Sequence, residues 1–163
     1  MATGGDERRK CLDFALRLLA RRAHSRFQLL QKLRRHRFAA EVIEEVLADL
    51  TRRGYVNDVQ FAQGKAEYDL NSGKKGKQRV MIDLVRAGVS GTVAEEAVKR
   101  VFEGTDQGAV ALELAMKHKG RLSKLEPQAA RRRLFGLLQR RGFEMDVIRG
   151  VVERTLGGDF DEG

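Results

Sequence analysis

The stretch that decides the fold is LRRHRFAAEVIEEVL, residues 33–47. The same spacing of apolar positions returns in LVRAGVSGTVAEEAV, residues 84–98, and in LQRRGFEMDVIRGVV, residues 138–152. The copies begin 51 and 54 residues apart. A long repeat period is typical of stacked supersecondary units, each too small to bury its apolar face alone. The sequence therefore predicts a short array of three related helical units, and such arrays work mainly as binding surfaces.

Each copy lies in a segment with room for three helices, which predicts nine helices in an all-α fold. Ser25 with Gln28 forms a capping box that opens a helix, and Thr92 with Glu95 repeats the pattern. Pro127 stands where a first helical turn tolerates proline. The expected organisation is a basic N-terminal extension over 1–11, three-helix repeats over 12–56, 57–103 and 104–156, and an acidic tail over 157–163.

The turn before the last helix of each unit falls at residue 37, 88 or 142. Gly88 and Gly142 suit a helix end that requires positive φ, a conformation that costs a residue with a Cβ about 1 kcal/mol or more. Arg37 occupies the equivalent place in the first unit. Either the first unit turns differently or this turn carries strain.

Charge is unevenly distributed along the 163 residues, whose net charge is +9. Residues 12–56 hold ten Lys/Arg against five Asp/Glu, residues 57–103 eight against seven, and residues 104–156 eleven against six. Basic end units around a nearly neutral middle favour a polyanionic or acidic partner. Solvated lysines and arginines on ordinary helix surfaces are the alternative interpretation.

Cysteine content and hydropathy point to the cytoplasm. Cys11 is the only cysteine, so no internal disulfide can form, and a lone thiol fits a reducing compartment. The N-terminal stretch lacks the apolar core of a signal peptide, and no later segment is long and apolar enough to cross a bilayer. The sequence thus predicts a cytoplasmic protein without a membrane partner.

No residue pattern favours catalysis. His24, His36 and His118 lie far apart and lack metal-ligand spacing, and Cys11 has no local sequence partner. The expected protein is therefore not an enzyme and has neither cofactor nor metal.

Candidate binding residues are the basic side chains that lie away from the apolar stripes. Lys10, Arg17 and Arg21 share a helix face with Phe14. The loop Gly73–Lys77 combines glycine N–H groups with lysines just before a helix start, which suits a phosphate or an acidic side chain. It is not a nucleotide-binding P-loop, because Gln replaces the required Ser or Thr at position 78. The candidate set is Lys10, Phe14, Arg17, Arg21, Lys32, Arg35, Lys74, Lys75, Lys77, Arg79, Arg132 and Arg140.

The order and spacing of several short strings resemble the RecX family, bacterial regulators of the RecA recombinase. The strings are ALRLLARR (15–22) with Ser25, VIEEVLADL (42–50) with GYV (54–56), NDVQFA (57–62), and KG (75–76) before Arg79 and the 84–89 turn. The resemblance covers about residues 12–156. It implies an elongated, curved array of three three-helix repeats that lies in the helical groove of a RecA–DNA filament and inhibits recombinase and ATPase activity.

Two positions and one short segment depart from the family pattern. Asn57 stands where an acidic residue is usual, and Arg37 replaces the usual glycine. Acidic residues within 67–69 lie on a helix that is more basic in relatives, which argues against nucleic-acid contact on that face.

Two functions remain open at this point. In the first, the partner is the RecA filament, the protein is a monomer, and single- or double-stranded DNA is bound only weakly by the protein alone. In the second, the chain is an autonomous DNA-binding module whose basic helices contact phosphates directly.

Overall fold

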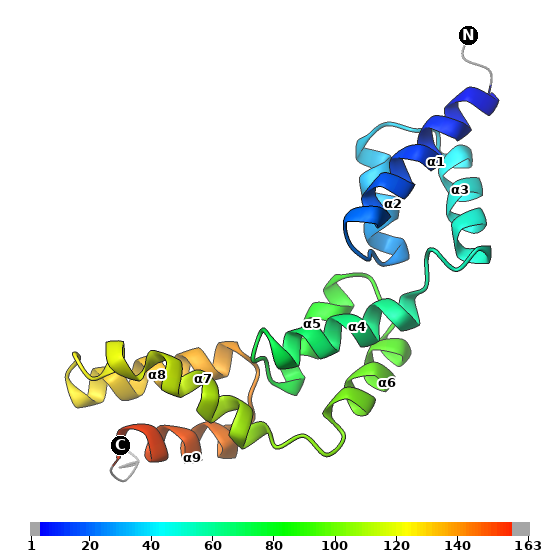
Figure 1. Ribbon diagram of the computed structural model, residues 1–163. Coiled ribbons are helices and arrows are strands. Elements are labelled where there is room, and N and C mark those ends of the chain that lie inside the picture. Colours follow the sequence, from blue (N-terminus) through cyan, green and yellow to red (C-terminus); the bar gives the residue numbers. More distant parts are fainter. Residues whose placement is uncertain (1–3, 158–163) are drawn as a thin grey trace. The chain divides into compact units, whose positions relative to one another are not determined.

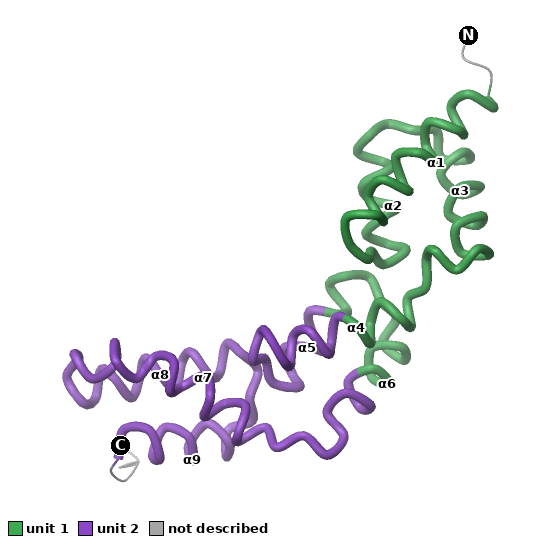
Figure 2. The backbone as a smooth tube through the Cα atoms, viewed as in Figure 1, with its two compact units in different colours: residues 1–64, 84–97 green, residues 65–83, 98–163 purple. Residues whose placement is uncertain are grey.

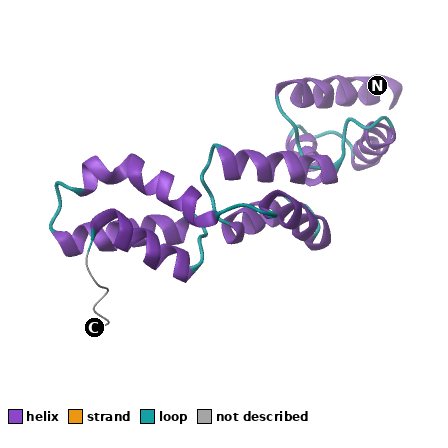
Figure 3. Cartoon of the chain, turned by 60° about the horizontal axis from the view of Figure 1, so that its bottom comes forward, coloured by secondary structure: helices purple, strands orange, loops and turns teal. Residues whose placement is uncertain are grey.

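The computed structural model describes residues 4–157. Over this range the chain forms nine α-helices and no strand (Figures 1 and 3). The helices are α1 Gly4–Arg21, α2 Arg26–Arg35, α3 Ala40–Arg52, α4 Asp58–Asn71, α5 Lys77–Arg86, α6 Gly91–Phe102, α7 Gln107–Leu122, α8 Pro127–Arg140 and α9 Met145–Leu156. The predicted all-α fold of nine helices is therefore confirmed for the described residues.

The helices group into two compact units (Figure 2). The first unit contains the residues up to Gly64 together with Leu84–Ala97, and the second contains Lys65–Asp83 together with the residues from Val98 onward. Helices α4, α5 and α6 each contribute residues to both units. The repeat boundaries expected at 56/57 and 103/104 stay a prediction.

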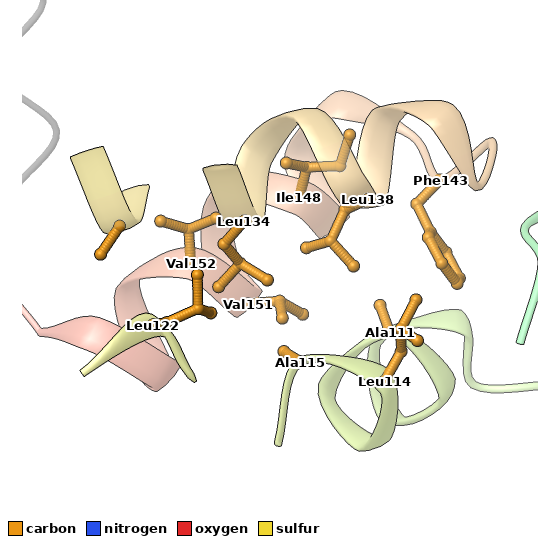
Figure 4. Close-up of a cluster of buried hydrophobic side chains, with 11 residues drawn as sticks. Ala111, Leu114, Ala115, Leu122, Leu134, Leu138, Phe143, Ile148, Val151 and Val152 are labelled. Carbon is orange, nitrogen blue, oxygen red and sulfur yellow. The ribbon is translucent and has the colours of Figure 1, made fainter. Parts of the chain in front are cut away.

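Each unit has its own hydrophobic core. In the first unit, α1, α2 and α3 enclose buried Cys11, Ala15, Leu29, Leu33, Ile43, Val46, Leu47 and Leu50, with Val56. In the second, the side chains of α8 and α9 face those of α7 (Figure 4). That core contains Ala111, Leu114, Ala115, Leu122, Ala130, Leu134, Leu138, Phe143, Ile148, Val151 and Val152.

The apolar positions that repeat along the sequence are buried to equivalent depths. Leu33, Leu84 and Leu138 are each 0% exposed. In each pair at the start of a third helix, the first residue is half-buried and the second is buried: Val42 and Ile43, Val93 and Ala94, Val147 and Ile148. The repeated spacing therefore marks the core-facing positions of three related three-helix repeats.

Helix starts follow the sequence signals with one exception. The Ser25–Gln28 capping box is present in full, and Pro127 is the first residue of α8. The capping box predicted at Thr92 and Glu95 is wrong, because α6 begins at Gly91 and places Thr92 inside the helix. The Oγ of Ser90 accepts a hydrogen bond from the backbone N–H three residues later and caps this helix instead.

Helix α1 begins at Gly4, so most of the stretch predicted as an N-terminal extension is the first part of this helix. The Glu7 carboxylate accepts a hydrogen bond from the Ala39 N–H at 2.8 Å. Arg8 lies 3.4 Å from a carboxylate oxygen of Asp49 on α3. These contacts join the beginning of α1 to the first three-helix repeat.

The turns before α6 and α9 pack on the start of an earlier helix, each inside one unit. In the first unit the Ser25 hydroxyl, just before α2, donates a hydrogen bond to the Ala87 carbonyl. In the second unit the Gly76 N–H, just before α5, donates to the Arg141 carbonyl at 2.6 Å. The turn before the last helix of one repeat thus packs on the start of the second helix of the preceding repeat.

This packing explains two glycines and sets Arg37 apart. Gly88 and Gly142 have φ of 84° and 82°. A Cβ at Gly88 would lie 2.2 Å from the Phe27 Cβ, and one at Gly142 would lie 2.2 Å from the Arg79 backbone nitrogen. Arg37 adopts the same left-handed conformation, with φ of 66°. The first unit therefore makes the same turn as the others and carries the backbone strain that a non-glycine residue has there.

Candidate functional site

Neither a metal site nor a transmembrane helix is found among residues 4–157. No three or more His, Cys, Asp or Glu side chains gather there in a way that could hold a metal ion. None of the helices in that range is both long and apolar enough to cross a bilayer. Burial, together with the charge of nearby Glu7, raises the pKa of the Cys11 thiol to about 11. A thiol of that kind is protonated at neutral pH and is a poor nucleophile.

The predicted basic face of α1 is partly paired. Lys10 forms an ion pair with Asp6 at 2.7 Å, and its hydrogen bond and charge lower the pKa of that carboxyl. Arg17 and Arg21 are exposed and make no ion pair within the described residues. The Arg17 guanidinium carbon lies 5.9 Å from the centre of the Phe14 ring. The face therefore offers two exposed guanidinium groups, and that of Arg17 lies near an aromatic ring.

Phe14 is half-buried and packs against the core. Its ring also stacks on His36, with centroids 4.2 Å apart and an interplanar angle of 12°. Arg35, exposed, and Lys32, half-buried, lie on α2 just before this histidine. The structure thus brings the end of α2 to the aromatic side chain of α1.

The lysine loop before α5 is built into the second unit. Lys75 Nζ lies 3.1 Å from an Asp69 oxygen and 2.9 Å from an Asp83 oxygen, and its side chain is 24% exposed. Lys74 pairs with Glu113 on α7 at 2.9 Å, and Arg79 pairs with Asp83 at 3.0 Å. Lys74, Lys75 and Arg79 therefore hold carboxylates of the same unit.

The carboxylates and cations of this loop shift one another's pKa values. Burial by itself raises the pKa of Asp83, but hydrogen bonds and charge from Lys75 and Arg79 outweigh it and lower the pKa below its ordinary value. Burial by itself lowers the pKa of Lys75, and its two carboxylate partners outweigh it and raise the pKa. Both groups are thus ionised at neutral pH.

The backbone donors of the same loop are also occupied. Besides the Gly76 N–H, the Lys77 N–H donates to the Gln107 side-chain oxygen at 3.3 Å, and the Gln78 N–H donates to the Gly142 carbonyl at 3.3 Å. These are the N–H groups that a phosphate cradle needs. Among the loop lysines, Lys77 is the one that is exposed and makes no ion pair with the described part of the chain.

Three arginines surround a depression on α8. Arg132, Arg133 and Arg140, together with Leu125 and Ala129, line a cavity of about 500 Å³. The three arginines are exposed and make no ion pair with any residue between 4 and 157. Clustered guanidinium groups of this kind suit phosphates or carboxylates.

The sequence pattern predicts part of these surfaces. It singles out Arg132 and Arg140 and misses Arg133, although the run of arginines at 131–133 is a signal for it. The histidine spacing argues against His36 as a metal ligand and gives this residue no other role. The signal for this position lies in the aligned turns, which read HRF at 36–38, AGV at 87–89 and RGF at 141–143. The first turn has a histidine and lacks the glycine that the other two share.

Known proteins match the chain in sequence and in fold. The family models "RecX, first three-helix domain" and "RecX, third three-helix domain" match residues 11–50 and 105–152. "Regulatory protein RecX" of Amycolatopsis mediterranei is 33% identical over 91% of this chain and 84% of that relative. The protein of the same name from Trichlorobacter lovleyi is 31% identical over 93% of this chain and 99% of that relative.

Solved structures share the fold. The crystal structure of RecX from Lactobacillus salivarius has a TM-score of 0.73 at 24% identity, covering 93% of this chain and 97% of that one. A second crystal structure of regulatory protein RecX has a TM-score of 0.78 at 20% identity, covering 90% and 73%. Two matching domain models, relatives that align over nearly the whole chain, and three tandem three-helix repeats show that this chain belongs to the RecX family of regulatory proteins.

Proposed function

We propose that this chain binds the RecA–DNA filament in the cytoplasm as a monomer and inhibits recombinase and ATPase activity. The observation that carries the proposal is membership of the RecX family over nearly the whole chain, with 33% identity over 91% of it. Exposed arginines on α1 (Arg17, Arg21) and on α8 (Arg132, Arg133, Arg140) add support, because none of these five forms an ion pair within the described residues. Such groups suit a polyanionic filament.

Inhibition requires that the protein distinguish between filament states. A ligand shifts an equilibrium only by its differential affinity for the two states. The proposal is therefore that the chain binds more tightly to a filament state that neither hydrolyses ATP nor exchanges strands. One basic group lies in each compact unit, so two weak contacts can act together and raise the overall affinity.

The test is a titration of ATP-hydrolysing RecA filaments with the full chain and with two triple variants. Alanine at Arg132, Arg133 and Arg140 is expected to raise the half-inhibitory concentration at least about tenfold, because each removes a charge-assisted contact. Lysine at the same three positions keeps the charge and is expected to lose much less. An unmodified chain that leaves ATP hydrolysis unchanged at saturating concentration would show that the proposal is wrong.

An autonomous DNA-binding module is the second candidate function, favoured by the same unpaired arginines. It predicts that naked DNA is bound as tightly as the assembled filament at equal salt. The logarithm of affinity for single-stranded DNA should fall linearly with the logarithm of salt concentration, by about 0.7 per phosphate contact. The triple alanine variant is expected to reduce this slope by roughly 2. An unchanged slope would mean that the α8 depression does not contact phosphates.

A further inference from the structure

The turn at residues 35–38 is free, whereas its two equivalents are packed against another repeat. The turn before α6 packs on the start of α2, and the turn before α9 packs on the start of α5. No repeat precedes the first one in the part of the chain that the structure describes. Its turn therefore exposes Arg35, His36 and Arg37, at the place where the other repeats bury Ala87 and Gly142.

His36 forms an aromatic platform with one open face. It stacks nearly parallel on Phe14 at 4.2 Å, and Phe38 lies 5.0 Å from His36 and 6.2 Å from Phe14. These three centroid distances form a triangle with nearly a right angle at His36. Phe38 therefore lies beside the imidazole edge, and the face opposite Phe14 is covered by no other ring of the described chain.

Cationic side chains flank this platform. Arg17 lies over the Phe14 ring. Arg34, Arg35 and Arg37 lie within two residues of His36 in the sequence, are exposed, and form no ion pair with the described residues. Arg37 occupies a left-handed conformation that glycine occupies in the other two repeats and that strains a residue with a Cβ. Strained residues of this kind cluster at functional sites.

We propose that the open face of His36 stacks an unpaired nucleobase of single-stranded nucleic acid, with the flanking arginines bound to the adjoining phosphates. Stacking of bases on aromatic side chains, combined with backbone contacts from arginines, is how proteins hold single strands without reading sequence. Phe14 is held by the core of the first unit and keeps the imidazole in place. Bases in a duplex are stacked on each other, so the platform selects single strands. The inference deepens the nucleic-acid contact of the proposed function and assigns it to this turn.

The experiment compares two oligonucleotides of equal length, oligothymidylate and a strand made only of abasic sites, by fluorescence anisotropy at one salt concentration. The wild-type chain is expected to prefer oligothymidylate by about 5- to 100-fold. The variant His36→Ala is expected to lose this preference and to keep its affinity for the abasic strand, since the arginines remain. His36→Phe restores an aromatic face and is expected to restore the preference. His118→Ala, a change of the same kind on α7, is the matched control and is expected to bind like wild type.

Two results would overturn the inference. One is equal affinity of the wild-type chain for both strands, as an acidic-peptide site at this turn would give. The other is an equal loss of affinity for both strands in His36→Ala. Inhibition of RecA ATPase is measured on the same proteins, so that failure of this inference can be told from failure of the proposed function. Inhibition without base preference would contradict only the stacking site at His36. Base preference without inhibition would contradict only the proposed binding to the RecA filament.

Discussion

Aspartate in place of Val46 is expected to unfold the first three-helix repeat. Val46 is 0% exposed in the core formed by α1, α2 and α3. A carboxylate there loses its hydration and finds no cation in the core, which costs several kcal/mol. We expect the free energy of unfolding of this repeat to fall by about 4 kcal/mol or more.

The three isoleucines of the chain make this prediction easy to follow by methyl NMR. Ile43 lies in the same core as Val46, whereas Ile148 lies in the core of α7, α8 and α9. The Ile43 signal is expected to move to its unfolded position in Val46→Asp, and the Ile148 signal to remain dispersed. Ala48→Asp, an exposed position on the same helix, is the control and should leave both signals in place. An equal loss of stability in Val46→Asp and Ala48→Asp would show that burial of the Val46 side chain is not what stabilises this core.

Methionine in place of Lys75 is expected to destabilise the second unit by about 3 kcal/mol. The substitution keeps most of the side-chain volume and removes the cation that bridges Asp69 and Asp83, each of which also pairs with a second cation. Asp69 is 2% exposed and keeps Lys65 at 3.0 Å, so the variant loses one of two cations that offset this buried carboxylate. Urea denaturation followed by circular dichroism measures the loss.

Lys77→Met, in the same loop, is the matched control. This lysine is exposed and lacks an ion pair within the described residues, so the expected change is within about 0.5 kcal/mol. If the loop bound phosphate and had no structural role, the result would differ. Both variants would then keep the wild-type stability, and both would bind DNA more weakly.

The ion pairs of Lys75 with Asp69 and Asp83 stabilise the second unit to an extent that depends on pH. The lowered pKa of Asp83 gives stability that is present above the ordinary aspartate pKa of about 3.9 and is lost as the pH falls through the lowered value. The raised pKa of Lys75 gives stability that is present below the ordinary lysine pKa of about 10.4 and is lost as the pH rises through the raised value. The difference between wild type and Lys75→Met should therefore be constant near neutral pH and shrink at both extremes.

Local signals in the sequence predicted most of the helical framework. Apolar spacing identified core positions such as Leu33 and Ile148, because a helix places residues three and four apart on one face. Ser25 and Pro127 marked helix starts because each acts on the backbone of its own first turn. The Thr92 capping box failed because Ser90, two residues earlier, satisfies the same first-turn donors.

The sequence by itself thus determined three related three-helix repeats, the positions that fill their cores, and membership of the RecX family. Tertiary structure alone decided which basic residues are free: Lys75 is held by Asp83, and the Gly76 N–H by Arg141. It also placed His36 on Phe14, two residues that lie on different helices. Helical periodicity depends on neighbours within a turn or two, so one sequence shows it. Charge neutralisation and ring stacking depend on side chains that only the packing of separate helices brings within a few ångströms.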